Sequence, residues 1–147
     1  MKYQFQIATA LNVAVAAALA GVGLDYVLSP GLKAHHLQIL DVSFDSLTVR
    51  TQILLVALMK GTGLVAIQGA VGLALLLLVP FRRRENWSRW AILAIGGLTL
   101  IPTLFGALRL RAQTGAAAEW WPHVVMLSAL LLAFGLARDF RNVELTN

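Results

Sequence analysis

Four apolar segments follow one another along this chain, and the second is the longest. Between Ile53 and Val79 the clearly polar side chains are Lys60, Thr62 and Gln68. A core helix of a soluble protein does not need so long an apolar run, whereas a helix that crosses a hydrocarbon layer about 30 Å thick needs roughly 20 such residues. This segment therefore predicts a membrane-spanning helix.

The same apolar pattern recurs in three other segments, which are separated by shorter polar connections. The predicted spans cover about residues 5–28, 52–80, 89–110 and 121–138. Short connections place neighbouring helices antiparallel, and 147 residues leave no room for a second folded domain. The sequence therefore predicts an all-α polytopic membrane protein, a single domain built as an antiparallel bundle of four transmembrane helices.

The connection between the first two predicted spans is the longest, and it begins at Ser29-Pro30-Gly31. Proline removes a backbone donor and glycine permits a turn, so the first helix should end there. A helix over residues 32–40 would place five side chains on one face: Leu32, His35, His36, Ile39 and Leu40. This face predicts one short extracytoplasmic amphipathic helix, and Asp45 or Ser46 is expected to cap the second span.

A signal peptide is the alternative interpretation of the first apolar segment, because Ala18-Leu19-Ala20 before Gly21 resembles a cleavage site. The apolar run continues past that point to Leu28, which favours a retained span. Small residues recur in it every four positions, as at Ala10 and Ala14, and such ridges let helix backbones approach closely in lipid. The first span is therefore expected to pack centrally.

Composition supports a membrane protein and excludes several kinds of chemistry. Hydrophobic residues make up 59% of the chain and charged residues 13%, and the mean hydropathy is +0.75, outside the averages of soluble domains. The chain has no cysteine, which excludes disulfides, thiolate catalysis and the four-helix membrane oxidoreductases that pass disulfides to quinones. The net charge of +5 reports orientation in a membrane protein, so no nucleic-acid partner is expected.

The charged connections predict how the chain is oriented. Between the second and third spans, Arg82, Arg83, Arg84 and Arg89 stand against a single acid, Glu85. Cytoplasmic connections are enriched in lysine and arginine, so this connection should be cytoplasmic. The predicted location is therefore a bacterial-type inner membrane, crossed several times, with both termini on the cytoplasmic side.

Counting along the spans places ionisable groups from separate helices at one depth. At about 1.5 Å per residue, 20 residues cross a layer of about 30 Å. Twenty residues counted from the cytoplasmic boundary end at Asp25 in the first span, at Lys60 in the second and beside Arg109 in the third. The fourth span begins at the outer boundary, close to His123. The predicted ligand-binding cluster at the outer boundary, with two histidines in the connection above it, consists of Asp25, Lys60, Arg109, His123, His35 and His36.

These residues also have purely structural interpretations. Lys60 either extends to the headgroups or pairs with Asp25, or else it meets an anionic group of a ligand, since a lysine at that depth is costly without a partner. Arg109 and His123 are most simply interfacial side chains. The two adjacent histidines diverge on a helix and are a weak metal signal, so we predict neither a metal nor a cofactor.

The leading functional hypothesis is non-catalytic: the chain binds a lipid-like or other amphiphilic molecule, or acts as an accessory subunit, through this cluster. The expected partners are membrane lipids, with a homo-oligomer or a larger membrane complex as further assemblies. The enzymatic alternative is a membrane enzyme in which Lys60, Asp25 and His123 act on a lipid or isoprenoid head group, which requires the three side chains to converge on one pocket.

A small oligomeric transporter is the third hypothesis. It requires a polar seam through Asn12, Gln68 and Thr99. No predicted span carries an acidic residue near its middle, which argues against proton-coupled export of the small multidrug type. A passive route stays open.

Overall fold

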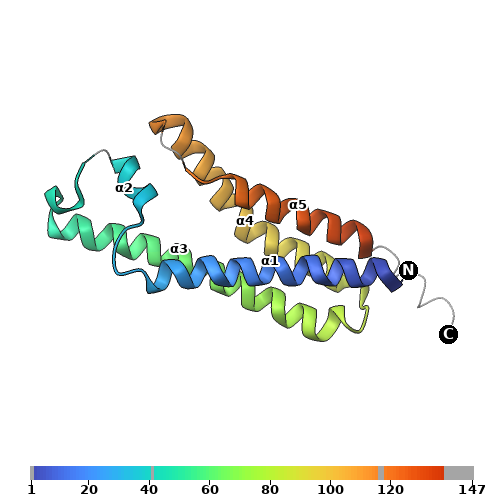
Figure 1. The fold of residues 1–147 in the computed structure, drawn as a ribbon. Coiled ribbons are helices and arrows are strands. Elements are labelled where there is room, and N and C mark those ends of the chain that lie inside the picture. The colour runs from blue at the N-terminus through green and yellow to red at the C-terminus, as the bar shows by residue number, and fades with distance from the viewer. Residues whose placement is uncertain (1, 41, 116–117, 138–147) are drawn as a thin grey trace.

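The computed structural model describes residues 2–40, 42–115 and 118–137, and within these ranges the chain is helical and forms no β-strand. The elements are α1 (Lys2–Leu28), α2 (Ala34–Leu40), the 3₁₀ turn η1 (Phe44–Ser46), α3 (Val49–Leu76), the π-helical turn η2 (Leu77–Phe81), α4 (Asn86–Thr114) and α5 (Trp121–Leu136) (Figure 1). The predicted all-α class is confirmed.

Three helices are long and apolar enough to cross a membrane: Tyr3–Leu28, Val49–Phe81 and Asn86–Thr114. They correspond to the predicted spans at 5–28, 52–80 and 89–110. The fourth apolar helix, α5, has 16 residues, or about 24 Å at 1.5 Å per residue, and is shorter than a hydrocarbon layer of about 30 Å. Residue 138 of the predicted fourth span lies outside the described residues.

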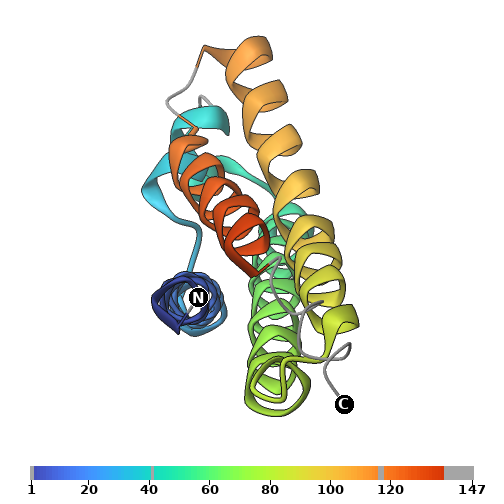
Figure 2. The ribbon, with the colours of Figure 1, turned by 90° about the vertical axis from the view of Figure 1, so that its right-hand side faces the viewer.

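The four longer helices pack in a closed cycle, with contacts from α1 to α3, α3 to α4, α4 to α5 and α5 back to α1. Successive members run in opposite directions (Figures 1 and 2). The buried apolar core follows the inner faces of all four; its largest fully buried side chains are Val15, Leu73, Phe81, Leu100 and Leu130. α2 lies outside this cycle, at the end of the molecule that we call the α2 end (Figure 1).

The contact between α1 and α3 depends on two glycines that face each other. A Cβ added to Gly23 would lie 2.7 Å from the carbonyl oxygen of Gly63, and a Cβ added to Gly63 would lie 2.8 Å from the carbonyl oxygen of Gly23. No larger side chain fits there without moving a backbone. The close approach that small residues permit between helices in lipid therefore occurs at this point.

The chain reverses between α3 and α4 through a turn that closes with a residue in the left-handed region. Pro80 lies inside the π-helical turn η2, where the wider turn accommodates a residue without an N–H. The N–H of Arg84 then donates to the carbonyl of Phe81 at 2.9 Å, and that of Glu85 donates to the carbonyl of Pro80 at 3.0 Å. This is a Schellman closure, and Arg84 has a φ of 59° at the position that usually holds glycine, at a cost of about 1–2 kcal/mol for an L-residue.

The predicted cap of the second long helix is wrong. Asp45 and Ser46 belong to η1, and the N-cap of α3 is Thr48, whose side chain accepts a hydrogen bond from the backbone N–H of Thr51 at 3.3 Å. The reason is local: the residues from 44 to 46 form a separate turn, which leaves the next hydroxyl to cap the helix.

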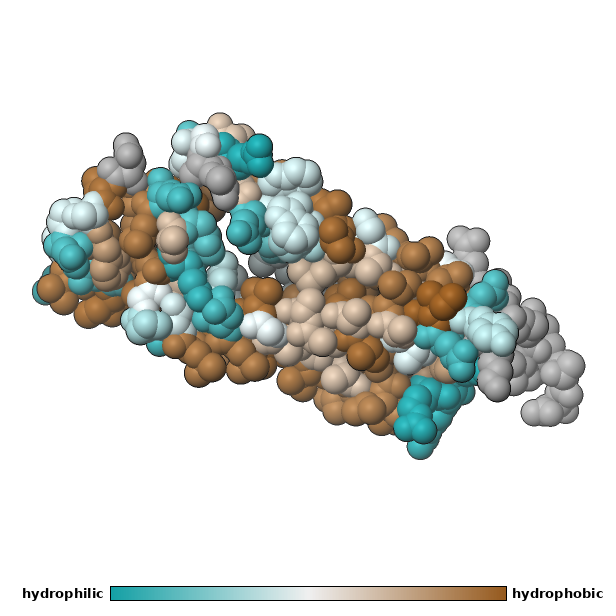
Figure 3. All heavy atoms as spheres, in the orientation of Figure 1, coloured by the Kyte–Doolittle hydropathy of each residue, from teal (hydrophilic) through white to brown (hydrophobic). Residues whose placement is uncertain are grey.

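Most of the visible surface over the middle of the helices is hydrophobic (Figure 3). Hydrophilic residues gather near the connection between α3 and α4, which we call the arginine end, and around the connection between α1 and α2 (Figure 3). Large apolar side chains are exposed along the long helices, for example Leu75, Leu98 and Leu131. A surface of this kind is compatible with helices that cross a membrane.

The glycine contact leads to a paired prediction. Gly23→Ala should lower the free energy of unfolding by about 1–3 kcal/mol, because the added methyl group overpacks the contact with α3. Gly21→Ala, two residues away, adds a Cβ that meets nothing within 4 Å and should be neutral or stabilising, since alanine is the better helix former. Thermal unfolding of both variants in mild detergent measures the difference. Equal melting temperatures would contradict the contact.

Candidate functional site

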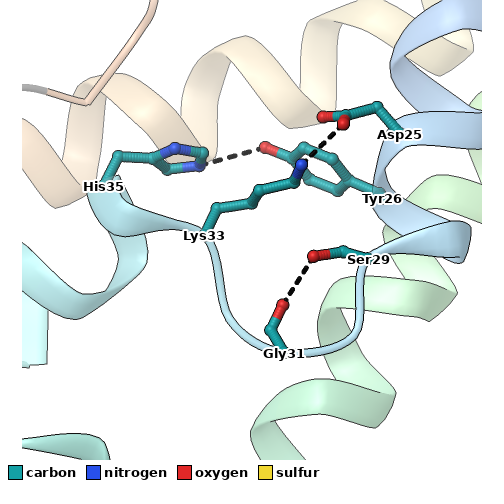
Figure 4. A network of polar contacts seen from close by, with 6 residues as sticks. All are labelled: Asp25, Tyr26, Ser29, Gly31, Lys33 and His35. Atoms are coloured by element: carbon teal, nitrogen blue, oxygen red, sulfur yellow. Dashed lines mark hydrogen bonds and ion pairs between the residues drawn. The ribbon is translucent and has the colours of Figure 1, made fainter.

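A tight turn after α1 brings α2 back over the end of that helix. The hydroxyl of Ser29 donates to the carbonyl of Gly31 at 2.7 Å, and the turn places the start of α2 beside the last turn of α1 (Figure 4). The side chains gathered here are Asp25, Tyr26, Lys33, His35 and His36. We call this group the α2 cluster.

An ion pair joins the two helices at the edge of the cluster. Lys33 Nζ lies 2.6 Å from Asp25 Oδ1, with side-chain exposures of 27% and 60% (Figure 4). Pairs this exposed contribute at most about 1 kcal/mol to stability. Its main consequence is that the charge of Asp25 is already matched by Lys33 and not by Lys60.

An aromatic and imidazole stack forms the inner part of the cluster. The hydroxyl of Tyr26 and Nε2 of His35 are 3.2 Å apart (Figure 4). The ring of Tyr26 meets His36 edge-on at 5.7 Å, and the two imidazole rings lie 4.1 Å apart. Nδ1 of His36 is buried and makes no hydrogen bond to the described residues, so the cluster holds an unused imidazole nitrogen.

The burial of His36 changes its titration. Desolvation, and secondarily the charge of His35, lower the pKa of His36 from its usual value of about 6.5. The neutral imidazole is therefore the form that the folded protein favours.

The segment before α5 approaches the same end of the molecule. The carboxylates of Glu119 and Asp25 are close enough to act electrostatically on the hydroxyl of Tyr26. His123, in the first turn of α5, lies beside the backbone of Glu119 and Trp120. Its Nδ1 is buried and has no hydrogen-bond partner in the described ranges.

The two remaining predicted residues do not join the α2 cluster. Lys60 is partly buried on α3, one turn before Gly63, which packs against Tyr26 and Val27; this register puts it level with the end of α1. Among the described residues it makes no hydrogen bond and no ion pair. Arg109 is exposed near the end of α4.

An apolar surface begins next to Lys60 and runs away from the centre of the molecule. Ile53, Leu54 and Leu58, in the first part of α3, are 65%, 57% and 61% exposed. η1 covers only the start of this part, where the amide of Gln52 donates to the carbonyls of Phe44 and Leu47. The first part of α3 therefore keeps these apolar side chains exposed, and we call them the apolar strip; Ile53, two turns before Lys60, is the member that lies on the lysine's face of the helix.

Three members of the α2 end were missed by sequence reasoning: Tyr26, Lys33 and Glu119. Depth counting considered charged groups inside the spans, so it included neither the phenol of Tyr26 nor Lys33 and Glu119, which lie in connections. The turn at Ser29-Pro30-Gly31 was the available signal, since a reversal there returns Lys33 to the level of Asp25.

The enzymatic hypothesis stays a prediction, because it requires a shared pocket and not direct bonds among its three side chains. Within the described part of the chain, no hydrogen bond or ion pair joins any two of Asp25, Lys60 and His123. The described residues also hold no group of three or more His, Asp or Glu side chains placed to bind a metal ion.

The polar residues expected to form a transport seam do not share one interior surface. Asn12 and Thr99 are buried, whereas Gln68 is exposed. The hydroxyl of Thr99 donates to the carbonyl of Ile95 in its own helix at 2.9 Å. Within one chain the three side chains therefore do not share a buried surface, and the oligomeric arrangement that the hypothesis requires stays a prediction.

Comparison with known proteins adds no assignment. No protein family matches this sequence, and comparison with curated proteins and with solved structures gave no match.

Acidification should weaken the docking of α2. The pKa of His36 is lower in the folded protein than in the unfolded chain. The contribution of this histidine to the stability of the folded state is therefore complete above about pH 6.5, and it is lost as the pH falls through the pKa of the folded state. An NMR titration of the His36 ring in detergent should give a pKa below the usual value, and His35→Gln should raise it by removing a neighbouring charge. A His36 pKa at or above the usual value would contradict its burial.

Proposed function

We propose that the chain is an integral protein of a bacterial-type inner membrane, crosses it four times, and keeps both termini and the arginine end on the cytoplasmic side. The three long apolar helices support the membrane placement. α5 supports a fourth crossing because it packs along α1 and α4, and a short helix can cross where the bilayer thins or flanking residues reach the interface.

In this placement the first part of α3 extends beyond the hydrocarbon layer. Lys60 lies 21 residues before Phe81, which corresponds to about 30 Å of helix. With Phe81 at the cytoplasmic boundary, Lys60 reaches the opposite boundary. Ile53, Leu54 and Leu58 then lie outside that layer with more than half of each side chain exposed.

We infer that this chain binds a lipid-like or otherwise amphiphilic molecule at the α2 end. The observation that carries the proposal is the apolar strip formed by Ile53, Leu54 and Leu58, of which Ile53 shares the helix face of Lys60. The lysine itself is a charged group with no partner among the described residues. An amphiphile would cover the strip with its chain and bring its anionic head to the ammonium group. Binding would remove the exposed apolar side chains from water and would give the charge of Lys60 a partner, and both changes lower the free energy.

The α2 cluster supplies polar groups for the head of such a molecule. His35 and His36 offer imidazole nitrogens, and the charge of Lys33 is already balanced by Asp25. The net attraction for an anionic head therefore comes from Lys60. A partner membrane chain seated on the same strip would make the protein an accessory subunit, and identifying what co-purifies separates these two outcomes.

Removing the charge of Lys60 should lower the retention of the amphiphile. Lys60→Met keeps the length and apolar part of the side chain and removes the ammonium group, so an anionic amphiphile should be retained about fivefold less, the effect of one basic residue near a membrane surface. Quantitative mass spectrometry of molecules that co-purify in mild detergent gives the measurement.

Gln68→Leu is the matched control, because Gln68 is an exposed polar residue two turns further along the same helix. It should leave the co-purified molecules unchanged. If Lys60→Met and the original protein retain the same amount of the co-purified molecule and have the same melting temperature, the lysine has no role in binding.

The orientation can be tested because the chain has no cysteine. A single cysteine in exposed Gln38 of α2, Gln38→Cys, should react with a membrane-impermeant maleimide in intact cells whose outer membrane has been permeabilised. A cysteine in exposed Arg83, Arg83→Cys, should react only after the inner membrane is opened. The reverse labelling pattern would invert the proposed topology.

A further inference from the structure

The arginine end holds a second charged surface, which is separate from the α2 cluster and from the apolar strip. Arg82, Arg83 and Arg84 are consecutive and exposed, and the one acid beside them is Glu85. The carboxylate of Glu85 accepts a hydrogen bond from Nε1 of Trp87 at 2.7 Å. In the part of the chain that the structure describes, no carboxylate pairs with these three guanidinium groups.

The backbone holds one of these arginines in a defined place. Arg84 occupies the left-handed position of the Schellman closure, with a φ of 59°, which glycine would adopt more easily. Its guanidinium lies 4.8 Å from the centre of the Phe5 ring, and Phe5 stacks on Phe81 with ring centres 5.4 Å apart. The start of α1 and the end of η2 therefore form an aromatic support for this charge.

The fourth arginine of the connection has a different environment. Arg89 is buried, and its guanidinium lies 5.1 Å from the ring centre of Phe134. It faces the interior between α4 and α5 and is not part of the exposed surface. The exposed positive charge is thus limited to three arginines. Trp87 and Trp90, which follow them in the sequence, are about half exposed, and tryptophan is enriched at the headgroup level of membranes.

We propose that Arg82, Arg83 and Arg84 form a binding site for the phosphate-bearing head of an anionic phospholipid. The site needs only the membrane placement of the long helices and is independent of the amphiphile proposed at the α2 end. Guanidinium groups bind phosphate oxygens with two donors each, and basic groups between helices at the cytoplasmic boundary select anionic headgroups. The strained position of Arg84 is then explained by the side chain that it presents.

Arg84→Gly separates lipid binding from folding. Glycine suits the left-handed position, so the melting temperature should stay equal or rise, while affinity for an anionic lipid should fall about fivefold. The double variant Arg82→Gln, Arg83→Gln should reduce the affinity for the anionic lipid about 25-fold, because each lost arginine accounts for about fivefold. The measurement is native mass spectrometry of the full chain titrated with phosphatidylglycerol, and with phosphatidylcholine of the same chain length.

Arg111→Gln is the control, because it removes another exposed arginine, which lies near the far end of α4 from the arginine connection. It should leave the phosphatidylglycerol affinity unchanged. An equal loss in this control, or unchanged affinity in Arg84→Gly, would overturn the site. Inorganic phosphate that binds as tightly as the lipid, with the same dependence on Arg84, would overturn the assignment to a lipid head.

Discussion

The backbone contact between Gly23 and Gly63 is the constraint on which the rest of the structure depends. It sets the register of α1 against α3, and that register brings Tyr26 over Gly63 and ends α1 level with Lys60. α2 can dock on Tyr26 only because α1 ends there. In the proposed membrane placement the helices face an apolar solvent, where close packing of backbones supplies the association that the hydrophobic effect supplies in water.

The two ends of the molecule handle charge in different ways. At the α2 end, acids, imidazoles and lysines are mixed, and the pair of Asp25 and Lys33 cancels part of the charge. At the arginine end, three guanidinium groups stand together, and Glu85 is engaged by Trp87. This asymmetry supports the proposed orientation, and it also separates two proposed binding sites by the length of the helices.

The candidate site shows where sequence reasoning stops. Counting residues along a helix places Asp25 and Lys60 near one boundary, because the rise per residue is nearly constant. It does not say which way each side chain points or what reaches it. Lys33 reaches Asp25 because the chain reverses at Pro30 and Gly31, and this reversal depends on turn geometry and on the docking of α2 against Tyr26.

The pattern of apolar and basic residues predicted the helical class, the approximate positions of the three long apolar helices and the position of the arginine connection. These follow from properties that repeat or cluster along the chain, whereas the ends of the helices differ from the prediction by up to four residues. The tertiary structure decided which neighbours those residues have: glycine against glycine between α1 and α3, His35 against Tyr26, and Arg84 over Phe5. Such pairings join residues that are distant in sequence or separated by a turn, and they arise from the packing of whole helices, which no local periodicity encodes.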